Sequence, residues 1–261
     1  MTLKTLSYEV RERVAYITFT TPKRLNSISE SRLTDLEEVM DRLESDSSLH
    51  AVTITGEGRA FCVGLDLDLL KQAFEDMAYF GSIVRRLNEI ILRLEQLDVP
   101  VVAVVNGFAR AGGFEIALGC DLILMANEAK IGDNHTHVGV MPGGGSTQRL
   151  PRRIGAQAAK DLIWSARWLS GPEAVACGLA LRSVPLERLA EETETLLAQF
   201  RDKPRAVLSV VKKTIQGGEG LSIRDGVELE IRNFLDYMGN QPYPREMFWA
   251  SIKDKPARQP S

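Results

Sequence analysis

The chain has 261 residues, of which 44% are hydrophobic and 26% are charged, a composition typical of a globular protein with one sizeable core. A net charge of −3 provides no basic field, so we expect neither a nucleic-acid nor a membrane partner. Three widely spaced cysteines predict no disulfide framework, and the charged, alternating N-terminus is unlike a secretory signal. We therefore expect a cytoplasmic protein.

Strands and helices are predicted to alternate through the first half of the chain. The first two strands are expected to pair across a short turn at 11–13. Ser29 is placed to cap a helix, and apolar side chains at helical spacing predict a further helix between 83 and 97. This alternation predicts an α/β fold, in which ligands gather at the carboxyl ends of the strands. The predicted strands are 6–10, 14–20, 51–55, 100–105 and 121–126.

After Pro142 the spacing of apolar residues is that of helices. No low-complexity segment or interdomain linker separates this part from the first half. The helical C-terminal third is expected to be either a second unit or an oligomerisation element. The predicted helices are 148–154, 157–164, 172–177, 189–201, 204–216 and 223–237.

Two glycine-rich turns follow predicted strands. The turn at 56–61 begins like a dinucleotide-binding fingerprint but lacks its third glycine, so a tight turn is the better interpretation. Gly112 and Gly113 lie where a short helix is expected to begin, with unpaired N–H groups open to a substrate oxygen. Glu115 in the same turn is expected to stay ionised, which suits a general base. Close packing of the glycines, with Glu115 as a helix-dipole partner, fits these residues equally well.

Two of the three histidines stand just ahead of a run of glycines. Asp133, His135 and His137 occupy alternate positions, and in a strand they would share one face as a two-histidine, one-carboxylate metal site. Gly132 and the glycines that follow indicate a turn instead, so we expect no metal here. An acid–base site and a polar loop stay open as interpretations.

Five segments, in order over most of the chain, together resemble the crotonase superfamily of enoyl-CoA hydratases and isomerases. Each motif is weak by itself, but the collinear set is specific. The segments are PKRLNSIS (22–29), GRAFCVGLDL (58–67), VVAVVNGFARAGGFEIALGCDLILMANEAKIG (101–132), GVMPGGGSTQRLPRRIG (139–155) and SGPEAVACGLALRSVP (170–185).

The resemblance implies a crotonase-like spiral of ββα units over residues 1–200 and a helical region over 201–261 that takes part in oligomerisation, as a homotrimer or homohexamer. It implies an acyl-CoA thioester substrate, as in fatty-acid metabolism, with no metal and no cofactor other than the coenzyme A of the substrate. The chemistry shared by the family is stabilisation of a thioester enolate by two backbone N–H groups, which fall on Leu65 and Gly112.

Hydratases that this chain resembles use two glutamates. The first matches Glu115, and the second belongs three residues after the glycine of a G-Q-P-E motif, where this chain reads GDNH (132–135). His135 thus takes the place of the second glutamate and, as an imidazolium, is expected to supply or relay a proton near neutral pH. Asp133 is expected to orient His135 or to bond nearby backbone, and His137 to lie in the pocket wall or at its rim.

The resemblance also suggests residues that contact coenzyme A and the acyl group. Arg24 lies where the family has a basic residue near the CoA phosphates, and Asp66 matches a position near the CoA-binding turn. A solvated arginine and a helix cap are the plainer interpretations of these two. Gly113 is expected beside the substrate, and Lys253 aligns loosely with a lysine that touches CoA. Residues 74–80 fall where the family lines its acyl pocket.

Three other residues are interpreted structurally. No basic partner is visible beside Cys62, so we interpret it as packing. Trp164 and Trp168 are expected in the core or at a subunit interface. The glycines after Pro142 are expected to shape the pocket wall before the helix at Gln148.

The leading hypothesis is an enoyl-CoA hydratase-like lyase, in which Glu115 handles water and His135 replaces the second acid. The alternative among enzymes is another CoA-thioester reaction that uses His135, such as C–C hydrolysis, decarboxylation or isomerisation. A catalytically weak scaffold homologue is the alternative outside enzymes.

Overall fold

The computed structural model describes residues 2–241 and 243–253. The chain divides into two compact units, Met1–Arg201 and Asp202–Ser261, which are described separately below. The first unit holds every strand in the described part of the chain, and the second is helical.

A six-stranded sheet forms the centre of the first unit, and it contains all five strands that the sequence predicted. The first two strands form an antiparallel hairpin whose turn residues, Glu12 and Arg13, have φ values of 47° and 65°. All other pairings in this sheet are parallel. In sheet order the strands are β1 (Leu6–Arg11), β2 (Val14–Phe19), β3 (Ala51–Gly56), β5 (Val101–Val105), β7 (Leu122–Ala126) and β10 (Arg182–Val184).

A second sheet of four short strands was not predicted. Its first three strands pair in parallel, and the last pairs antiparallel to its neighbour. Strands of two or three residues are too short to show an alternating pattern, which is why the sequence gave no sign of them. In sheet order they are β4 (Ala60–Cys62), β6 (Phe108–Arg110), β8 (Lys130–Gly132) and β9 (Leu169–Ser170).

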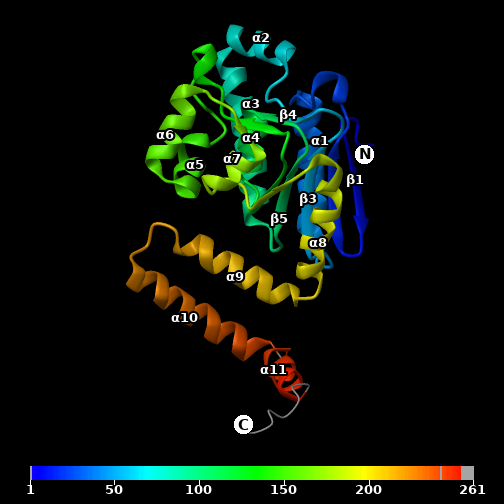
Figure 1. Cartoon of the computed structure of the whole chain (residues 1–261), viewed down its shortest axis with the longest axis vertical. Coiled ribbons are helices and arrows are strands. Elements are labelled where there is room, and N and C mark those ends of the chain that lie inside the picture. Colours follow the sequence, from blue (N-terminus) through cyan, green and yellow to red (C-terminus); the bar gives the residue numbers. More distant parts are fainter. Residues whose placement is uncertain (1, 242, 254–261) are drawn as a thin grey trace. The chain divides into compact units, whose positions relative to one another are not determined.

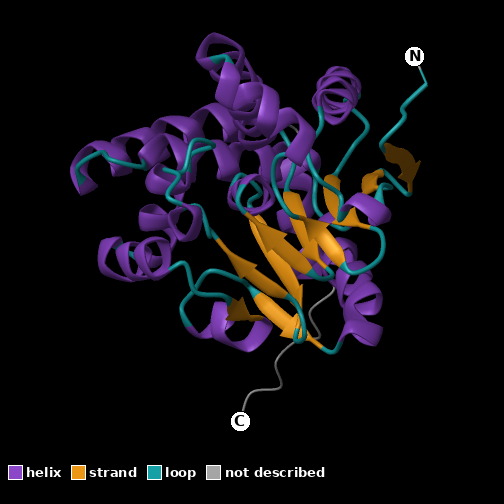
Figure 2. Ribbon diagram, turned by 90° about the horizontal axis from the view of Figure 1, so that it is seen from above, coloured by secondary structure: helices purple, strands orange, loops and turns teal. Residues whose placement is uncertain are grey.

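Consecutive strands alternate between the two sheets, with β3, β5 and β7 in the first and β4, β6 and β8 in the second. Helices follow each pair, so the chain winds as the ββα spiral that the resemblance implied. Figures 1 and 2 show the strands grouped together with helices packed around them. The helices are α2 (Leu67–Glu75) and α3 (Met77–Gln96) after β4, α4 (Gly112–Leu118) after β6, and α5 (Ser146–Ile154) and α6 (Ala156–Ser165) after β8.

Helix α1 (Glu30–Ser45) begins where the sequence predicted, since the Ser29 side chain accepts a hydrogen bond from the Arg32 backbone N–H. Its apolar face is buried, as is that of α3. Burying one large apolar side chain contributes about 1.5–3 kcal/mol, so these faces hold the helices on the sheets. Helices α7 (Gly171–Ala176) and α8 (Leu189–Arg201) and the short 3-10 helices η1 (Pro22–Arg24), η2 (Thr136–Val138) and η3 (Leu186–Arg188) complete the unit.

The second unit consists of α9 (Arg205–Gly218), α10 (Ile223–Asn240) and α11 (Tyr243–Lys253). Helices α9 and α10 pack against each other. Many of their apolar side chains remain exposed in the isolated chain, among them Ile215, Phe234 and Leu235. Among the described residues, no helix is both long enough and apolar enough to cross a membrane.

Candidate active site

Three neighbouring strands of the second sheet position the site. Because β4, β6 and β8 are parallel and adjacent, the segments that follow them leave the sheet at the same edge. These segments carry Leu65 after β4, Gly112 and Glu115 after β6, and Asp133 and His135 after β8. Residues up to 70 positions apart in the chain therefore meet because of strands that the sequence did not reveal.

A cavity of about 660 Å³ lies at this edge. Its polar wall contains Glu115, His135 and the glycines that follow Pro142 as far as residue 144. The rest of its lining is largely apolar and comes from α2, α3 and the loop beyond η2, including Leu70, Phe74, Phe80, Val84, Leu87, Val140 and Met141. A polar end joined to an apolar chamber suits a substrate that reacts at one end of an apolar chain.

In the described part of the chain, two residues that line the cavity have backbone N–H groups without a backbone acceptor. Leu65 and Gly112 both line it, and the Cα of Gly64 lies 3.4 Å from the position a Cβ on Gly112 would take. Among the described residues, neither N–H donates to a backbone oxygen. Gly112 begins α4, where helix N–H groups have no partner within the helix. Both N–H groups are therefore left without a partner in the described backbone, as the predicted pair of donors to a thioester oxygen requires, and that role stays a prediction.

Glu115 is 2% exposed, and its Oε1 accepts hydrogen bonds from the backbone N–H of Gly144 at 2.6 Å and of Ser146 at 3.4 Å. The sequence predicted that the start of the helix would keep this carboxylate ionised. Burial instead raises its pKa, against the positive charge of His135 and the Gly144 N–H, which lower it. A glutamate with a raised pKa is closer to the pH at which a general base works best.

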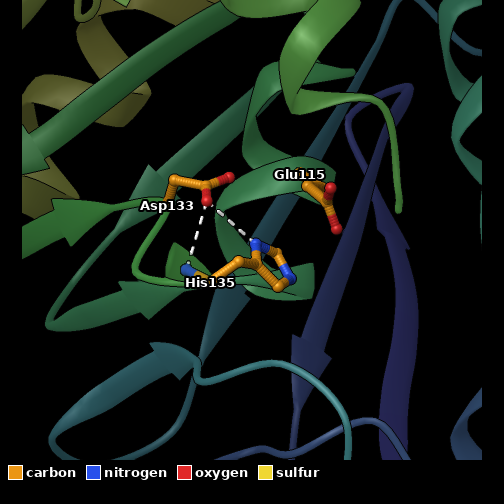
Figure 3. A group of neighbouring side chains, drawn as sticks. All are labelled: Glu115, Asp133 and His135. Carbon is orange, nitrogen blue, oxygen red and sulfur yellow. Dashed lines mark hydrogen bonds and ion pairs between the residues drawn. The ribbon is translucent and has the colours of Figure 1, made fainter. Parts of the chain in front are cut away.

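His135 is held by the fully buried Asp133. The Oδ1 of Asp133 accepts hydrogen bonds from the His135 backbone N–H at 3.2 Å and from its Nδ1 at 3.0 Å (Figure 3). Because a carboxylate only accepts, Nδ1 carries a hydrogen, and Nε2 lies on the far side of the ring from Asp133 (Figure 3). Burial by itself would lower the pKa of His135, but the hydrogen bond and charge of Asp133 raise it overall.

The pKa of Asp133 shifts in the opposite direction to that of His135. Burial would raise the pKa of this carboxyl, but the hydrogen bonds from His135 and Ser146 and the charge of His135 together outweigh burial and lower it. The pair is therefore best described as a carboxylate that stabilises an imidazolium, in the manner of the carboxylate that orients a catalytic histidine.

The metal site considered from the sequence required residues 133–137 to form a strand, with Asp133, His135 and His137 on one face, and this strand does not form. Residues 133–137 are no strand, since Asn134 has a φ of 58° and η2 begins at Thr136. His137 points to the exposed rim of the cavity. Side-chain atoms of Glu115, Asp133 and His135 do lie within 4.8 Å of one another, close enough to share an ion. The hydrogen bond from Nδ1 accounts for the closeness of Asp133 and His135 without a metal. That no metal binds here stays a prediction.

Residues 9–246 match the family described as enoyl-CoA hydratase/isomerase. This chain belongs to the enoyl-CoA hydratase/isomerase family. It is 32% identical over 236 residues to the short-chain-enoyl-CoA hydratase of Clostridium acetobutylicum, covering 90% of this chain and 89% of the relative. It is 36% identical over 212 residues to the mitochondrial methylglutaconyl-CoA hydratase of Rattus norvegicus, covering 78% and 66%. The crystal structure of an enoyl-CoA hydratase from Bacillus anthracis matches with a TM-score of 0.90 at 28% identity, covering 97% and 98%.

The comparisons confirm the crotonase-like fold and the family that the motifs indicated. The family acts on acyl-CoA thioesters. The two hydratases named above differ in the acyl group that their names state, so family membership leaves the acyl group of this chain open.

Three of the residues predicted to contact CoA make hydrogen bonds or packing contacts within the chain. Arg24 donates to Asp66 at 3.1 Å, and Asp66 caps α2 by accepting from the Asp68 N–H. Gly113 has a packing reason to be glycine, because a Cβ there would lie 2.0 Å from the carbonyl oxygen of Cys62. None of these residues lines the cavity. Lys253 ends α11, and its side chain lies outside the described residues.

The aromatic residues separate into different environments. Phe74 and Phe80, from the segment predicted to line the acyl pocket, meet edge to face at 5.7 Å in the cavity wall. Trp168 also lines the cavity. Trp164 is 73% exposed, so of its two predicted positions the core is excluded and the subunit interface stays a prediction. Cys62 is fully buried, and burial raises its pKa to about 11, so the thiol is inert as the packing interpretation predicted.

Two residues of the site, Ser146 and Arg110, escaped the sequence analysis, and Gly144 was predicted only as part of the pocket wall, which it lines. Gly144 has no side chain because a Cβ there would lie 2.3 Å from Oε2 of Glu115, and it donates the shortest hydrogen bond to that residue. Ser146 starts α5 beside the same carboxylate. Arg110 lines the cavity and lowers the pKa of His135. The glycine run was a visible signal for Gly144, whereas Ser146 and Arg110 reach the site only through the fold.

Proposed function

We propose that this chain is an enoyl-CoA hydratase-like lyase, which adds water to an enoyl-CoA thioester or removes it from the hydrated product. The observation that carries the proposal is the placement of Glu115 and His135 in the wall of one cavity, beside the free N–H groups of Leu65 and Gly112. Similarity to hydratases at about 30% identity supports the same reaction class.

In the proposed reaction the thioester oxygen accepts hydrogen bonds from the Leu65 and Gly112 N–H groups. Adding hydroxide at the β-carbon moves negative charge onto this oxygen, and fixed donors stabilise that charge without reorganising. Removing one such donor in other enzymes costs about 10²–10³ in kcat. The acyl chain extends into the apolar part of the cavity, which supports an apolar rather than a charged acyl group.

Glu115 and His135 divide the two proton transfers. Ionised Glu115 takes a proton from water as the hydroxide bonds to the β-carbon, and protonated His135 gives its Nε2 proton to the α-carbon. The proton then returns from Glu115 to His135 through solvent, which restores both groups. Burial of Glu115 and the charge of Asp133 support these roles, since they raise the pKa of the base and of the imidazolium respectively.

The Asp133–His135 hydrogen bond also supports a second candidate, in which His135 is the principal catalyst. The reaction would then be another conversion of a CoA thioester, namely C–C hydrolysis, decarboxylation or isomerisation. Both candidates use the same pair of N–H donors, and they differ in what Glu115 does.

The decisive experiment is loss of the enoyl-thioester absorbance when the purified enzyme meets a panel of short, branched and long enoyl-CoAs. We expect rapid loss with at least one member, a fall of about 10²–10⁴ in Glu115→Gln, and a marked fall in His135→Ala. No loss on any member, despite measured CoA binding, would contradict hydration. Unchanged turnover in Glu115→Gln would instead favour the candidates in which His135 acts as the principal catalyst.

We further propose that the chain assembles as a homotrimer or homohexamer through its C-terminal helices. Exposed apolar side chains on α9–α11 support an oligomeric contact, since monomers rarely expose apolar patches of this kind. A cytoplasmic location, the absence of a cofactor beyond the coenzyme A of the substrate, and CoA contacts of Arg24, Asp66, Gly113 and Lys253 stay predictions.

A further inference from the structure

Ser146 lies between the two carboxylates of the site. It is 0% exposed, begins α5 and follows Gly145, whose φ is 100°. Its Oγ is 3.3 Å from Oε1 of Glu115, a long distance for a hydroxyl donor. That oxygen already accepts the Gly144 N–H at 2.6 Å, so the hydroxyl is a weak third partner there.

The other carboxylate has a free acceptor. Within the described residues, Oδ2 of Asp133 is buried and accepts no hydrogen bond, while Oδ1 accepts two from His135. A buried oxygen without a donor is costly, which favours any donor that can turn toward it. The Ser146 hydroxyl is near enough to contribute to the lowered pKa of Asp133. A hydroxyl has a single hydrogen and can donate to only one of the two carboxylates at a time.

We propose that Ser146 donates its hydroxyl hydrogen to Glu115 while Glu115 is ionised and to Oδ2 of Asp133 once Glu115 has taken a proton. The change is a rotation about the Cβ–Oγ bond, in which no covalent bond of the serine breaks. Ser146 is thus a positioning residue that couples the base to the Asp133–His135 pair. The inference rests on the proposed function, because it assigns a role to the residue between its two proton-transfer groups.

The coupling acts in the direction that hydration requires. A hydrogen bond to Oδ2 disperses the charge of Asp133, which weakens the hold of this carboxylate on the imidazolium of His135. His135 then releases its Nε2 proton more readily, at the step after Glu115 has taken one from water. Arg110 also faces His135 and favours release, but its charge does not change during the reaction.

The test measures the coupling directly, by titrating the imidazole C–H signals in NMR spectra of the full chain. The replacement Glu115→Gln mimics the protonated base and is made in chains with Ser146 or with Ser146→Ala. His50 and His137 serve as internal references, and Thr147→Ala is the matched control because it removes a neighbouring hydroxyl of the same helix.

Glu115→Gln removes a negative charge and lowers the pKa of His135 in every background. We expect Glu115→Gln to lower the pKa of His135 by more in the chain that keeps Ser146 than in the Ser146→Ala chain. In the Thr147→Ala chain, which keeps Ser146, the pKa should fall by the larger amount. Equal falls with and without the Ser146 hydroxyl would overturn the proposal, and Ser146→Gly provides the same comparison if the alanine variant does not fold. Ser146→Thr, which keeps a hydroxyl, should restore the larger fall.

Kinetics provide a second readout. On a substrate that the enzyme turns over, Ser146→Ala should lower kcat about fivefold with KM unchanged, the effect of one lost hydrogen bond. An unchanged kcat would contradict a role in the reaction. The titration needs no turnover, so the coupling is tested even if hydration itself is not the reaction.

Discussion

Glu115 is buried, His135 is half-buried beside it, and the pKa of each is raised. As proposed, the base works only when ionised and the acid only when protonated. Activity should therefore fall on the acid side as Glu115 takes a proton and on the basic side as His135 loses one, giving a bell-shaped profile of kcat/KM. Because the two groups interact, each limb reports the pair rather than one residue.

Asp133→Asn separates the contribution of this carboxylate to the pKa of His135 from the contribution of Glu115. The change keeps the size of the side chain but removes the charge that raises the pKa of His135, so that pKa should fall. The basic limb of kcat/KM should move to lower pH, and kcat/KM at neutral pH should drop by at least about tenfold. A basic limb that stays in place would show that Asp133 does not set the protonation of His135.

At the scale of elements, the start of α4 carries the proposed donor Gly112 and, directly before it, a strained backbone. Ala111 precedes the donor Gly112 and has a φ of 48°, a region that side chains with a Cβ avoid. Its methyl group also lies 2.9 Å from the position a Cβ on Gly64 would take. The chain keeps this strained residue between β6 and the helix that carries Glu115.

Ala111→Gly should relieve this strain. We expect the free energy of unfolding to rise by about 1 kcal/mol, because glycine adopts a positive φ without the steric cost. Urea denaturation followed by circular dichroism measures the change, with Ala109→Gly as the control in the neighbouring strand, where a loss is expected. A loss of stability in Ala111→Gly would mean that packing of the Ala111 methyl group stabilises the fold by more than the backbone strain costs.

The loop before α5 shapes the environment of the base. A methyl group on Gly144 would meet Oε2 of Glu115 at 2.3 Å, so Gly144→Ala should push the carboxylate aside. We expect kcat to fall about 10²-fold, as for a misplacement of about 1 Å, with CoA binding preserved. Steady-state kinetics and a CoA-binding titration check this, and Gly143→Ala is the matched control, because a Cβ on this neighbouring glycine meets Val84 only at an ordinary contact distance of 3.5 Å. Wild-type turnover in Gly144→Ala would remove Glu115 from the proposed mechanism.

At the scale of the whole molecule, the exposed apolar side chains of the C-terminal unit are the main unexplained surface of the isolated chain. Phe234 and Leu235 are 57% and 62% exposed on α10. Light scattering after size-exclusion chromatography should find a homotrimer or homohexamer for the intact chain. Phe234→Asp should shift the mass toward the monomer, because a charge in an apolar contact is costly. Arg232→Ser, on the same helix, is the control, and a monomeric wild type would overturn the proposed assembly.

The sequence by itself determined the α/β class, the capped start of α1, five of the six strands of the first sheet and helices α9 and α10. These depend on local patterns, namely runs of β-branched residues, helical spacing and a serine at a helix start, so they can be recognised within a short window. The family motifs also located Gly112, Glu115 and His135 as candidates before any contact was known.

Only the tertiary structure decided which groups surround those candidates. The strands of the second sheet are too short to leave a pattern, yet they bring the segments after β4, β6 and β8 to one edge. Burial by distant residues, rather than the helix start, sets the direction of the Glu115 pKa. Ser146 reaches Glu115 in the same way, whereas Asp133 and His135 are only two residues apart and their pairing was among the contacts predicted from the sequence. Proton affinity and hydrogen bonding depend on which groups lie within a few ångströms, and that proximity is set by the packing of segments far apart in the chain.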